Sequence, residues 1–248
     1  MQRRPSSDVP PSKPPVSAAR HCSIDIAVLR HPADMSSQRP PRIYVLAGVN
    51  GAGKSSIGGA AFRQFGGDYY NPDEAARTLM TADPALSQTE ANSAAWNVSV
   101  SLLKRAIEQR LDFAFETTLG ANTIPRLLAD AASQGIEIYV WYVGLANPEL
   151  HIQRVQARVR RGGHDIPEPD IRRRYEHSRL NLIALLPALT ALRVYDNSAD
   201  ADPAAGQTPS PILVLHMERG KILNPRALPR TPHWAKPIVA AALKLSLS

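Results

Sequence analysis

The chain has 248 residues, of which 44% are hydrophobic, and its formal net charge is +7. This length and apolar content suit one ordinary domain with a real core. The single cysteine, Cys22, excludes an intrachain disulfide and a cysteine-built metal site. No apolar run approaches the roughly 18 residues of a membrane span, and the first residues lack the apolar segment of a signal peptide. We therefore expect a cytoplasmic protein that has no membrane partner.

The positive charge is distributed unevenly along the chain. Residues 151–180 carry eight arginines against four acids, and residues 218–248 carry six basic residues against Glu218 alone, whereas residues 42–150 are acidic. A basic balance can indicate nucleic-acid binding. However, aromatic residues make up only 6% of the chain, and the central arginine cluster fits a phosphate clamp better. We therefore do not expect a nucleic-acid partner.

Residues 1–41 are rich in proline, serine and arginine, which predicts a disordered N-terminal arm. From residue 42 to residue 217, apolar runs of strand type alternate with patterns of helical spacing. Strands are predicted at 43–47, 68–70, 113–115, 136–143, 193–196 and 212–217, and helices at 56–64, 73–80, 87–109, 122–134, 147–160 and 170–186. This alternation predicts an α/β fold, a three-layer α/β/α sandwich with a mostly parallel sheet.

Two further expectations concern the packing of these elements. In the helix predicted at 87–109, Trp96, Val100, Leu103 and Ile107 recur at spacings of three and four and form its apolar face. Residues 218–248 contain four prolines, Pro225, Pro229, Pro232 and Pro237. They are expected to form a partly disordered C-terminal tail.

The segment from Gly48 to Ser55 fits the phosphate-loop template, Gly followed by four free positions and Gly-Lys-Ser/Thr. An apolar strand precedes it and a helix follows it, which is the context that the motif requires. Glycines let successive backbone N–H groups approach phosphate oxygens, Lys54 would reach the β- and γ-phosphates, and the Ser55 hydroxyl would bind Mg²⁺. We therefore expect ATP and Mg²⁺ as cofactors. The expected nucleotide contacts are Gly48, Asn50, Gly51, Ala52, Gly53, Lys54, Ser55 and Ser56.

Polar residues also follow two other predicted strands. Asp73 comes after the second strand, and Glu116 and Thr118 come after the third. Because ligands bind beyond the carboxyl ends of parallel strands, these groups should share a cleft with the phosphate loop. A kinase needs a base for its attacking hydroxyl, and Asp73 is the first choice. Glu116 would bind the acceptor or hold Mg²⁺ and its water, and Thr118 would offer a hydroxyl to the acceptor.

Arginines flank a glycine break. Arg154, Arg158 and Arg161 share one helix face, and residues 172–174 follow Gly162-Gly163. Phosphoryl transfer requires positive charge at the phosphate oxygens. We therefore expect residues 154–175 to form a lid over ATP, with Arg158 among the nucleotide contacts.

The ordered set of motifs resembles the zeta toxin family of P-loop kinases, over about residues 42–217. The matching parts are the phosphate loop, Asn71-Pro72-Asp73, Phe115-Glu116-Thr117-Thr118, Arg154, and the run from Arg161-Gly162-Gly163-His164 to Arg172-Arg173-Arg174-Tyr175. The Gly-Gly-His-Asp segment lengthens the spacing between the arginines relative to the best-known toxins.

The resemblance implies ATP-dependent phosphorylation of the sugar 3′-hydroxyl of UDP-N-acetylglucosamine, and an antitoxin protein as partner. By motif position, it implies Lys54 and Ser55 for the nucleotide and Mg²⁺, Asp73 as base, and Glu116 and Thr118 as sugar contacts. Arg154 and one of residues 172–174, for which Arg174 is the choice, would act on the phosphates.

Other classes of function stay open at this point. A P-loop kinase with a different hydroxyl acceptor would keep the same residues. A regulatory ATP-binding module would need neither Asp73 nor Glu116 in the cleft. A nucleic-acid-associated ATPase would bind in a steeply salt-dependent way and would not depend on the lid arginines.

Overall fold

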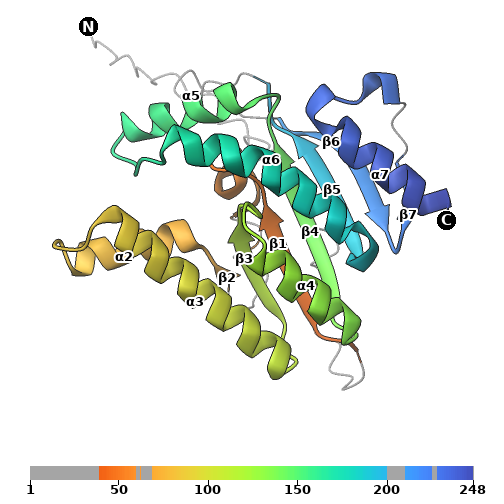
Figure 1. The fold of residues 1–248 in the computed structure, drawn as a ribbon, viewed down its shortest axis with the longest axis horizontal. Helices are drawn as coiled ribbons and strands as arrows, with labels where there is room; N and C mark the ends of the chain where they lie inside the picture. The colour runs from red at the N-terminus through yellow and green to blue at the C-terminus, as the bar shows by residue number, and fades with distance from the viewer. Residues whose placement is uncertain (1–38, 60–61, 63–68, 200–209, 225–227, 248) are drawn as a thin grey trace, which may run out of the picture.

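A computed structural model describes residues 39–59, 62, 69–199, 210–224 and 228–247 (Figure 1). The expected N-terminal arm lies outside the described residues except for residues 39–41. A seven-stranded sheet runs through the molecule in the order β2-β3-β1-β4-β5-β6-β7. Its strands are β1 (Arg42–Ala47), β2 (Tyr69–Tyr70), β3 (Phe113–Thr117), β4 (Glu137–Gly144), β5 (Ala191–Asp196), β6 (Ile212–Glu218) and β7 (Lys221–Ile222). The strands β2, β3, β1, β4 and β5 are parallel to one another, whereas β6 pairs antiparallel with β5 and β7 pairs antiparallel with β6.

The main helices are α2 (Pro72–Ala82), α3 (Gln88–Glu108), α4 (Thr123–Ser133), α5 (Pro148–Val159), α6 (Glu168–Leu185) and α7 (Lys236–Leu247). Local signals explain where they begin. Asn71 and Asn147 cap α2 and α5 through their side chains, each ahead of a proline, and Ser87 forms a capping box with Glu90 at the start of α3. Among the described residues, no helix has the length and apolar character needed to span a bilayer.

The hydrophobic core lies on both faces of the sheet, and the cluster of buried residues on one face is larger than that on the other. On one face, alternate strand residues such as Ile43 and Val45 pack against α3, α4, α6 and α7, which cover the sheet in Figure 1. On the other face, Tyr44 and Trp141 pack with Ile57 and Phe62, just after the phosphate loop. The residues of a short π-helical turn, η2 (Ser55–Gly59), thus supply part of the opposite layer. The rest of the helix predicted at 56–64, apart from Phe62, lies outside the described residues.

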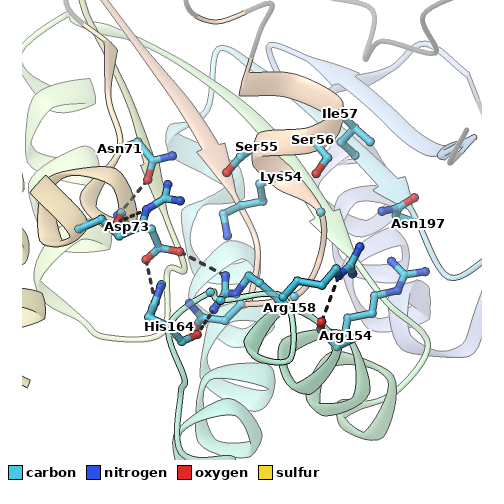
Figure 2. A pocket seen from close by; sticks show the side chains of 18 residues that line it. Lys54, Ser55, Ser56, Ile57, Asn71, Asp73, Arg154, Arg158, His164 and Asn197 are labelled. Atoms are coloured by element: carbon cyan, nitrogen blue, oxygen red, sulfur yellow. Dashed lines mark hydrogen bonds and ion pairs between the residues drawn. The ribbon is translucent and has the colours of Figure 1, made fainter. Parts of the chain in front are cut away.

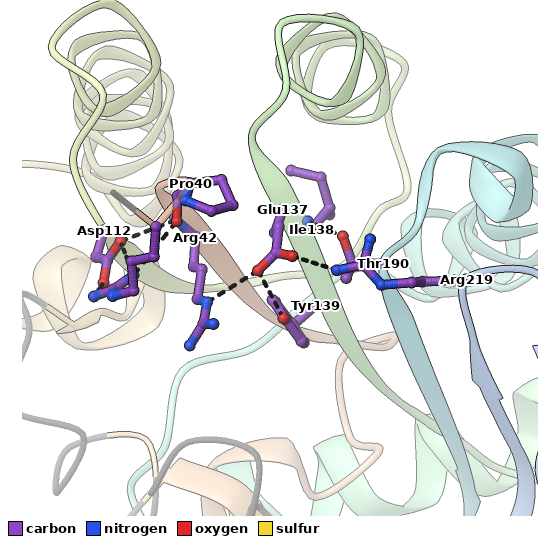
Figure 3. A network of polar contacts seen from close by, with 9 residues as sticks. Pro40, Arg42, Asp112, Glu137, Ile138, Tyr139, Thr190 and Arg219 are labelled. Atoms are coloured by element: carbon purple, nitrogen blue, oxygen red, sulfur yellow. Dashed lines mark hydrogen bonds and ion pairs between the residues drawn. The ribbon is translucent and has the colours of Figure 1, made fainter. Parts of the chain in front are cut away.

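The amino ends of β1 and β4 are joined by a network of polar contacts around Glu137 (Figure 3). Its carboxylate accepts hydrogen bonds from Arg42 Nε at 3.0 Å, from the Tyr139 hydroxyl at 2.9 Å and from Arg219 Nη2 at 2.6 Å. Asp112, just before β3, accepts a hydrogen bond from the Arg42 amide at 2.9 Å. These contacts lie at the amino ends of the strands, whereas the phosphate loop lies at the carboxyl end of β1, so we assign them a structural role.

The prediction of a C-terminal tail is wrong for its described part. After β7, the chain forms two 3₁₀ turns, η5 (Leu228–Arg230) and η6 (His233–Ala235), and then α7. Trp234, Ile238 and Val239 are buried in the main core. Pro229, Pro232 and Pro237 permit this because they lie at turns or in the first turn of a helix, where a missing N–H costs little.

The predicted apolar face of α3 is also only partly correct. Leu103 and Ile107 are buried in the main core, but the Trp96 side chain is 41% exposed. The first half of α3 instead lines a cavity on the side that carries Trp96 and packs on α2 through Ala91 and Ala95. A further 3₁₀ turn, η3 (Leu186–Ala188), connects α6 to β5.

Candidate active site

The phosphate loop lies at the carboxyl end of β1, next to the ends of β3 and β4. Gly48, Gly51 and Gly53 all have positive φ angles, a conformation that glycine adopts without steric cost. The Gly48 amide donates to the Thr117 carbonyl at 3.2 Å, which ties the loop to β3. The Lys54 side chain points into the cavity that the loop borders, and Lys54 is only 8% exposed (Figure 2).

Glu116, near the end of β3, contacts the last residue of the loop. The Ser55 hydroxyl donates to Glu116 Oε2 at 3.2 Å, and the Tyr69 hydroxyl donates to Oε1. Glu116 is only 4% exposed. Burial raises the pKa of its carboxyl group, whereas the charge of Lys54 and the two hydroxyl donors lower it. Burial is the larger effect, so the pKa of Glu116 lies above its usual range.

The chemistry of Ser55 and Glu116 fits Mg²⁺ that arrives with a nucleotide. The described residues contain no group of three histidine, cysteine or acidic side chains that could hold a metal alone. Mg²⁺ does not need one, because it is commonly bound through one or two protein oxygens together with phosphates and water. The adjacent hydroxyl and carboxylate oxygens are ligands of this kind.

Asp73 faces the lid segment. It is the second residue of α2, where the Asn71 side chain accepts its backbone N–H at 2.9 Å. Its carboxylate lies between two lid groups, with Arg158 Nη1 3.8 Å from Oδ2 and His164 Nε2 3.9 Å from Oδ1 (Figure 2). Burial lowers the pKa of His164, although the charge of Asp73 opposes this, so the ring favours its neutral form.

Two cavities of similar size meet at this point. The first, of about 620 Å³, lies between the phosphate loop and the lid, and we call it the nucleotide cavity. The second, of about 640 Å³, lies between α3, the end of β3 and the start of α6, and we call it the acceptor cavity. Asn50 and Asp73 line both cavities. A group at Asp73 can therefore reach ligands in either.

The predicted site residues divide between these cavities. The nucleotide cavity is lined by Asn50, Gly51, Gly53, Lys54, Ser55, Ser56, Arg154 and Arg158. The acceptor cavity is lined by Glu116, Thr118 and Arg174. Two predicted contacts, Gly48 and Ala52, line neither cavity and instead form hydrogen bonds that shape the loop.

The lid arginines face different partners. Arg174 Nη1 donates to the Asn50 Oδ1 atom of the phosphate loop at 2.8 Å, and burial lowers its pKa. Arg172 points elsewhere, toward Glu149 at 2.6 Å, and Arg173 pairs with Asp170 at 2.8 Å. Arg154 Nη2 donates to the Ala199 carbonyl at 3.1 Å. Of residues 172–174, only Arg174 reaches the phosphate loop.

Sequence reasoning missed several residues of the site. Tyr69 and Asn197 belong to no motif, although Asn197 lies just beyond the carboxyl end of β5, which is a usable signal. A stripe on α3 also lines the acceptor cavity, comprising Thr89, Asn92, Ser93, Trp96 and Asn97. Its spacing of i, i+3, i+4, i+7 and i+8 marks one helix face, but a mostly polar stripe resembles a solvated surface in the sequence.

A phosphate-loop motif after the first strand of a mostly parallel sheet, with arginines of α5 lining the same cavity, is typical of a P-loop kinase fold. The chain belongs to the zeta toxin family, whose family model matches residues 27–202. An uncharacterized protein of Haemophilus influenzae is 31% identical over 132 residues, which cover 52% of this chain and 88% of that protein.

Two solved structures of the AvrRxo1-ORF1–AvrRxo1-ORF2 complex, one with sulphate ions and one with ATP, share this fold. Each has a TM-score of 0.58 at 14% identity and covers 86% of this chain. This chain spans 65% of the length of each matched chain.

Proposed function

We propose that this protein is an ATP-dependent kinase that phosphorylates a sugar hydroxyl of a nucleotide sugar, with UDP-N-acetylglucosamine as the first candidate. The observation that carries the proposal is the meeting of two cavities at Asp73. One cavity borders a phosphate loop, and the other has room for a separate substrate. A binding module would not need a carboxylate at their junction.

On the nucleotide side, the loop amides and Lys54 bind the β- and γ-phosphates, as the motif requires. One solved structure of the same fold is described with ATP, and we propose the same nucleotide here. Ser55 and Glu116 would hold Mg²⁺, which supplies positive charge at the phosphate oxygens. Residues 154–175 would close as a lid, bringing Arg154 and Arg158 to the phosphates.

In phosphoryl transfer the protein forms no covalent bond with the substrates; it positions them and stabilises charge. Asp73 accepts the proton of the acceptor hydroxyl, and the hydroxyl oxygen forms a bond to the γ-phosphorus. The bond from that phosphorus to the β–γ bridging oxygen breaks, and ADP leaves with the electron pair. Arg174 stabilises the negative charge on the transferred group, and Arg158, which lies 3.8 Å from Asp73, moves to the phosphates.

The lining of the acceptor cavity supports a nucleotide sugar. The α3 stripe offers amide and hydroxyl groups for sugar hydroxyls, and Trp96 offers a flat apolar surface for a ring. Arg173 and Arg174 lie on another wall, where they can bind a diphosphate. Glu116 and Thr118 complete the site near the reacting hydroxyl.

We also propose a cytoplasmic location and an antitoxin protein as partner. Both rest on membership of the zeta toxin family. A kinase that consumes a nucleotide sugar would act where such precursors are made, and a toxic activity would require an inhibitor.

The test is steady-state release of ADP with UDP-N-acetylglucosamine, comparing the wild type with Asp73→Asn. Removing a general base should lower kcat by about 10²-fold or more and leave the Kd of ATP unchanged. The matched control is Asp130→Asn, a change of the same kind at an exposed position on α4. Full turnover by Asp73→Asn would rule out Asp73 as the general base. If the wild type turned over no UDP-sugar, a nucleotide sugar would be ruled out as the acceptor.

A further inference from the structure

Two buried side chains outside the phosphate-loop motif hold carbonyl groups of the loop. His151 on α5 is 1% exposed, and its Nδ1 lies 2.8 Å from the Asn50 carbonyl oxygen. Asn197, just after β5, is 2% exposed, and its Nδ2 donates to the Ala52 carbonyl at 2.8 Å. The Asn197 backbone N–H is itself fixed to the Gly144 carbonyl at 3.0 Å.

The hydrogen bond between His151 and the Asn50 carbonyl determines which ring nitrogen of His151 carries the proton. A carbonyl oxygen only accepts hydrogen bonds, so Nδ1 must carry the proton. Burial lowers the pKa of His151 to about 4, and the ring is therefore neutral near pH 7. Nε2 has no hydrogen-bond partner among the described residues, which leaves the contact with Asn50 as the polar anchor of the ring.

Each of these contacts determines where the next amide points. In a trans peptide the carbonyl of one residue and the N–H of the next point in opposite directions. Because the Asn50 carbonyl is turned toward His151, the Gly51 N–H points away from that residue. Because the Ala52 carbonyl is turned toward Asn197, the Gly53 N–H points away from Asn197. Both glycines line the nucleotide cavity.

The two amides are left available for a ligand. Neither the Gly51 nor the Gly53 N–H donates to a backbone carbonyl among the residues that the structure describes. The anchors also pack tightly on the loop, since a Cβ on Gly51 would lie 2.6 Å from the His151 carbonyl oxygen and one on Gly53 would lie 2.6 Å from Asn197 Nδ2. The loop cannot shift toward either anchor.

We propose that His151 and Asn197 are positioning residues of the phosphate site, which turn two loop carbonyls outward and so aim the Gly51 and Gly53 amides at the phosphates. His151 lines neither cavity, so it acts on a ligand only through the loop, whereas Asn197 also lines the nucleotide cavity. The proposal rests on the proposed nucleotide site but not on the identity of the acceptor.

The test is the Kd of ATP with Mg²⁺, measured by calorimetry for the wild type and for two variants of His151. His151→Leu keeps a similar volume but has no donor, whereas His151→Asn places an amide N–H near the position of Nδ1. We expect His151→Leu to weaken ATP binding by about tenfold, the scale of one hydrogen bond to a charged group, and His151→Asn to restore most of it. The KM of the acceptor should not change.

Thermal unfolding of each variant separates this effect from a loss of folding. Should His151→Leu fail to fold, Asn197→Leu tests the same relation at the second carbonyl and should also weaken binding about tenfold. Equal ATP affinity in a folded Leu variant would overturn the inference while leaving the kinase proposal intact. Equal weakening by the Leu and Asn variants of His151 would also overturn it, because packing alone would then explain the loss. If the wild-type protein bound no ATP, the proposed kinase function itself would be contradicted.

Discussion

Arg174 and Arg172 lie two positions apart on α6 and differ in what they contact. Arg174 reaches the phosphate loop through Asn50, whereas Arg172 pairs with Glu149 and Glu168. We expect Arg174→Ala to lower kcat by roughly 10²-fold or more, as loss of a transition-state charge contact does, while Arg172→Ala stays near the wild type. Single-turnover kinetics with saturating ATP measure both. Equal losses in the two variants would contradict the assignment of Arg174.

His151 also predicts how stability depends on pH. Its pKa is about 4 in the folded protein against 6.5 unperturbed, so below pH 6.5 the unfolded chain binds a proton that the folded protein does not. Stability should therefore be complete above pH 6.5 and fall as the pH approaches 4, by roughly 3 kcal/mol from this group. Urea unfolding at pH 7 and pH 4.5 should show a smaller drop for His151→Asn, because asparagine does not titrate. The same drop in both proteins would contradict this account.

At this scale the motif residues were predictable, because the spacing of Gly48 to Ser55 and the strand-end positions of Asp73 and Glu116 follow general rules. Tyr69 and His151 were not, and the strand-end position of Asn197 did not indicate which group it would contact. Their roles depend on which strand ends and helices become neighbours in space, and no spacing along the chain records that. Among residues 172–174, the resemblance to the zeta toxin family, not helical spacing, gave Arg174 as the choice, and the contact of Arg174 with Asn50 is consistent with that choice.

The helix α3 shows how one element can serve two purposes. Its second half packs on the sheet, and its first half lines the acceptor cavity with Trp96 exposed. We expect Trp96→Ala to raise the KM of the acceptor by about tenfold, on the scale of one stacking contact, with little change in kcat. Trp96→Phe should recover much of this, and Val98→Ala, at an exposed position on the same helix, is the control. An unchanged acceptor KM in Trp96→Ala would rule out contact with the substrate.

The C-terminal elements are part of the core. Trp234 is buried, its indole N–H donates to Asp196 at 3.2 Å, and its ring lies against Gly144 and Tyr142. Trp234→Ala should lower the free energy of unfolding by about 3–5 kcal/mol, as for other buried aromatic residues. Leu247→Ala, at a side chain that is almost fully exposed, is the control in the same urea titration. A loss below about 1 kcal/mol would mean that this region is dispensable.

Most helices and strands were predictable because local signals agree with the fold, as at Asn71, Ser87 and Asn147, which cap helices through their side chains. Two elements were misjudged. Prolines in residues 218–248 suggested a tail, but Pro229, Pro232 and Pro237 occupy turns and a helix start and leave the apolar residues of α7 free to pack. The helical spacing predicted for α3 was correct, but a hydrophobic pattern does not reveal which apolar side chain lines a cavity.

In the whole molecule, the proposed functional groups gather at the carboxyl ends of the parallel strands. The Glu137 network lies at the amino ends of β1 and β4, so the structural polar groups are separated from the proposed functional ones. The order of the strands places β1 between β3 and β4, which puts the phosphate loop next to Glu116 and the lid. The alternation of strands and helices predicted a parallel sheet, but strand order is a long-range property that the alternation does not determine.

The central claim is phosphoryl transfer between the two cavities that meet at Asp73. Its most direct test is phosphorus NMR of the wild-type protein with ATP, Mg²⁺ and a panel of UDP-sugars, run beside Asp73→Asn. We expect a new phosphomonoester resonance on UDP-N-acetylglucosamine that is absent with the variant. ATP that stays intact, or that yields only inorganic phosphate with every UDP-sugar, would contradict the claim that a nucleotide sugar is the acceptor.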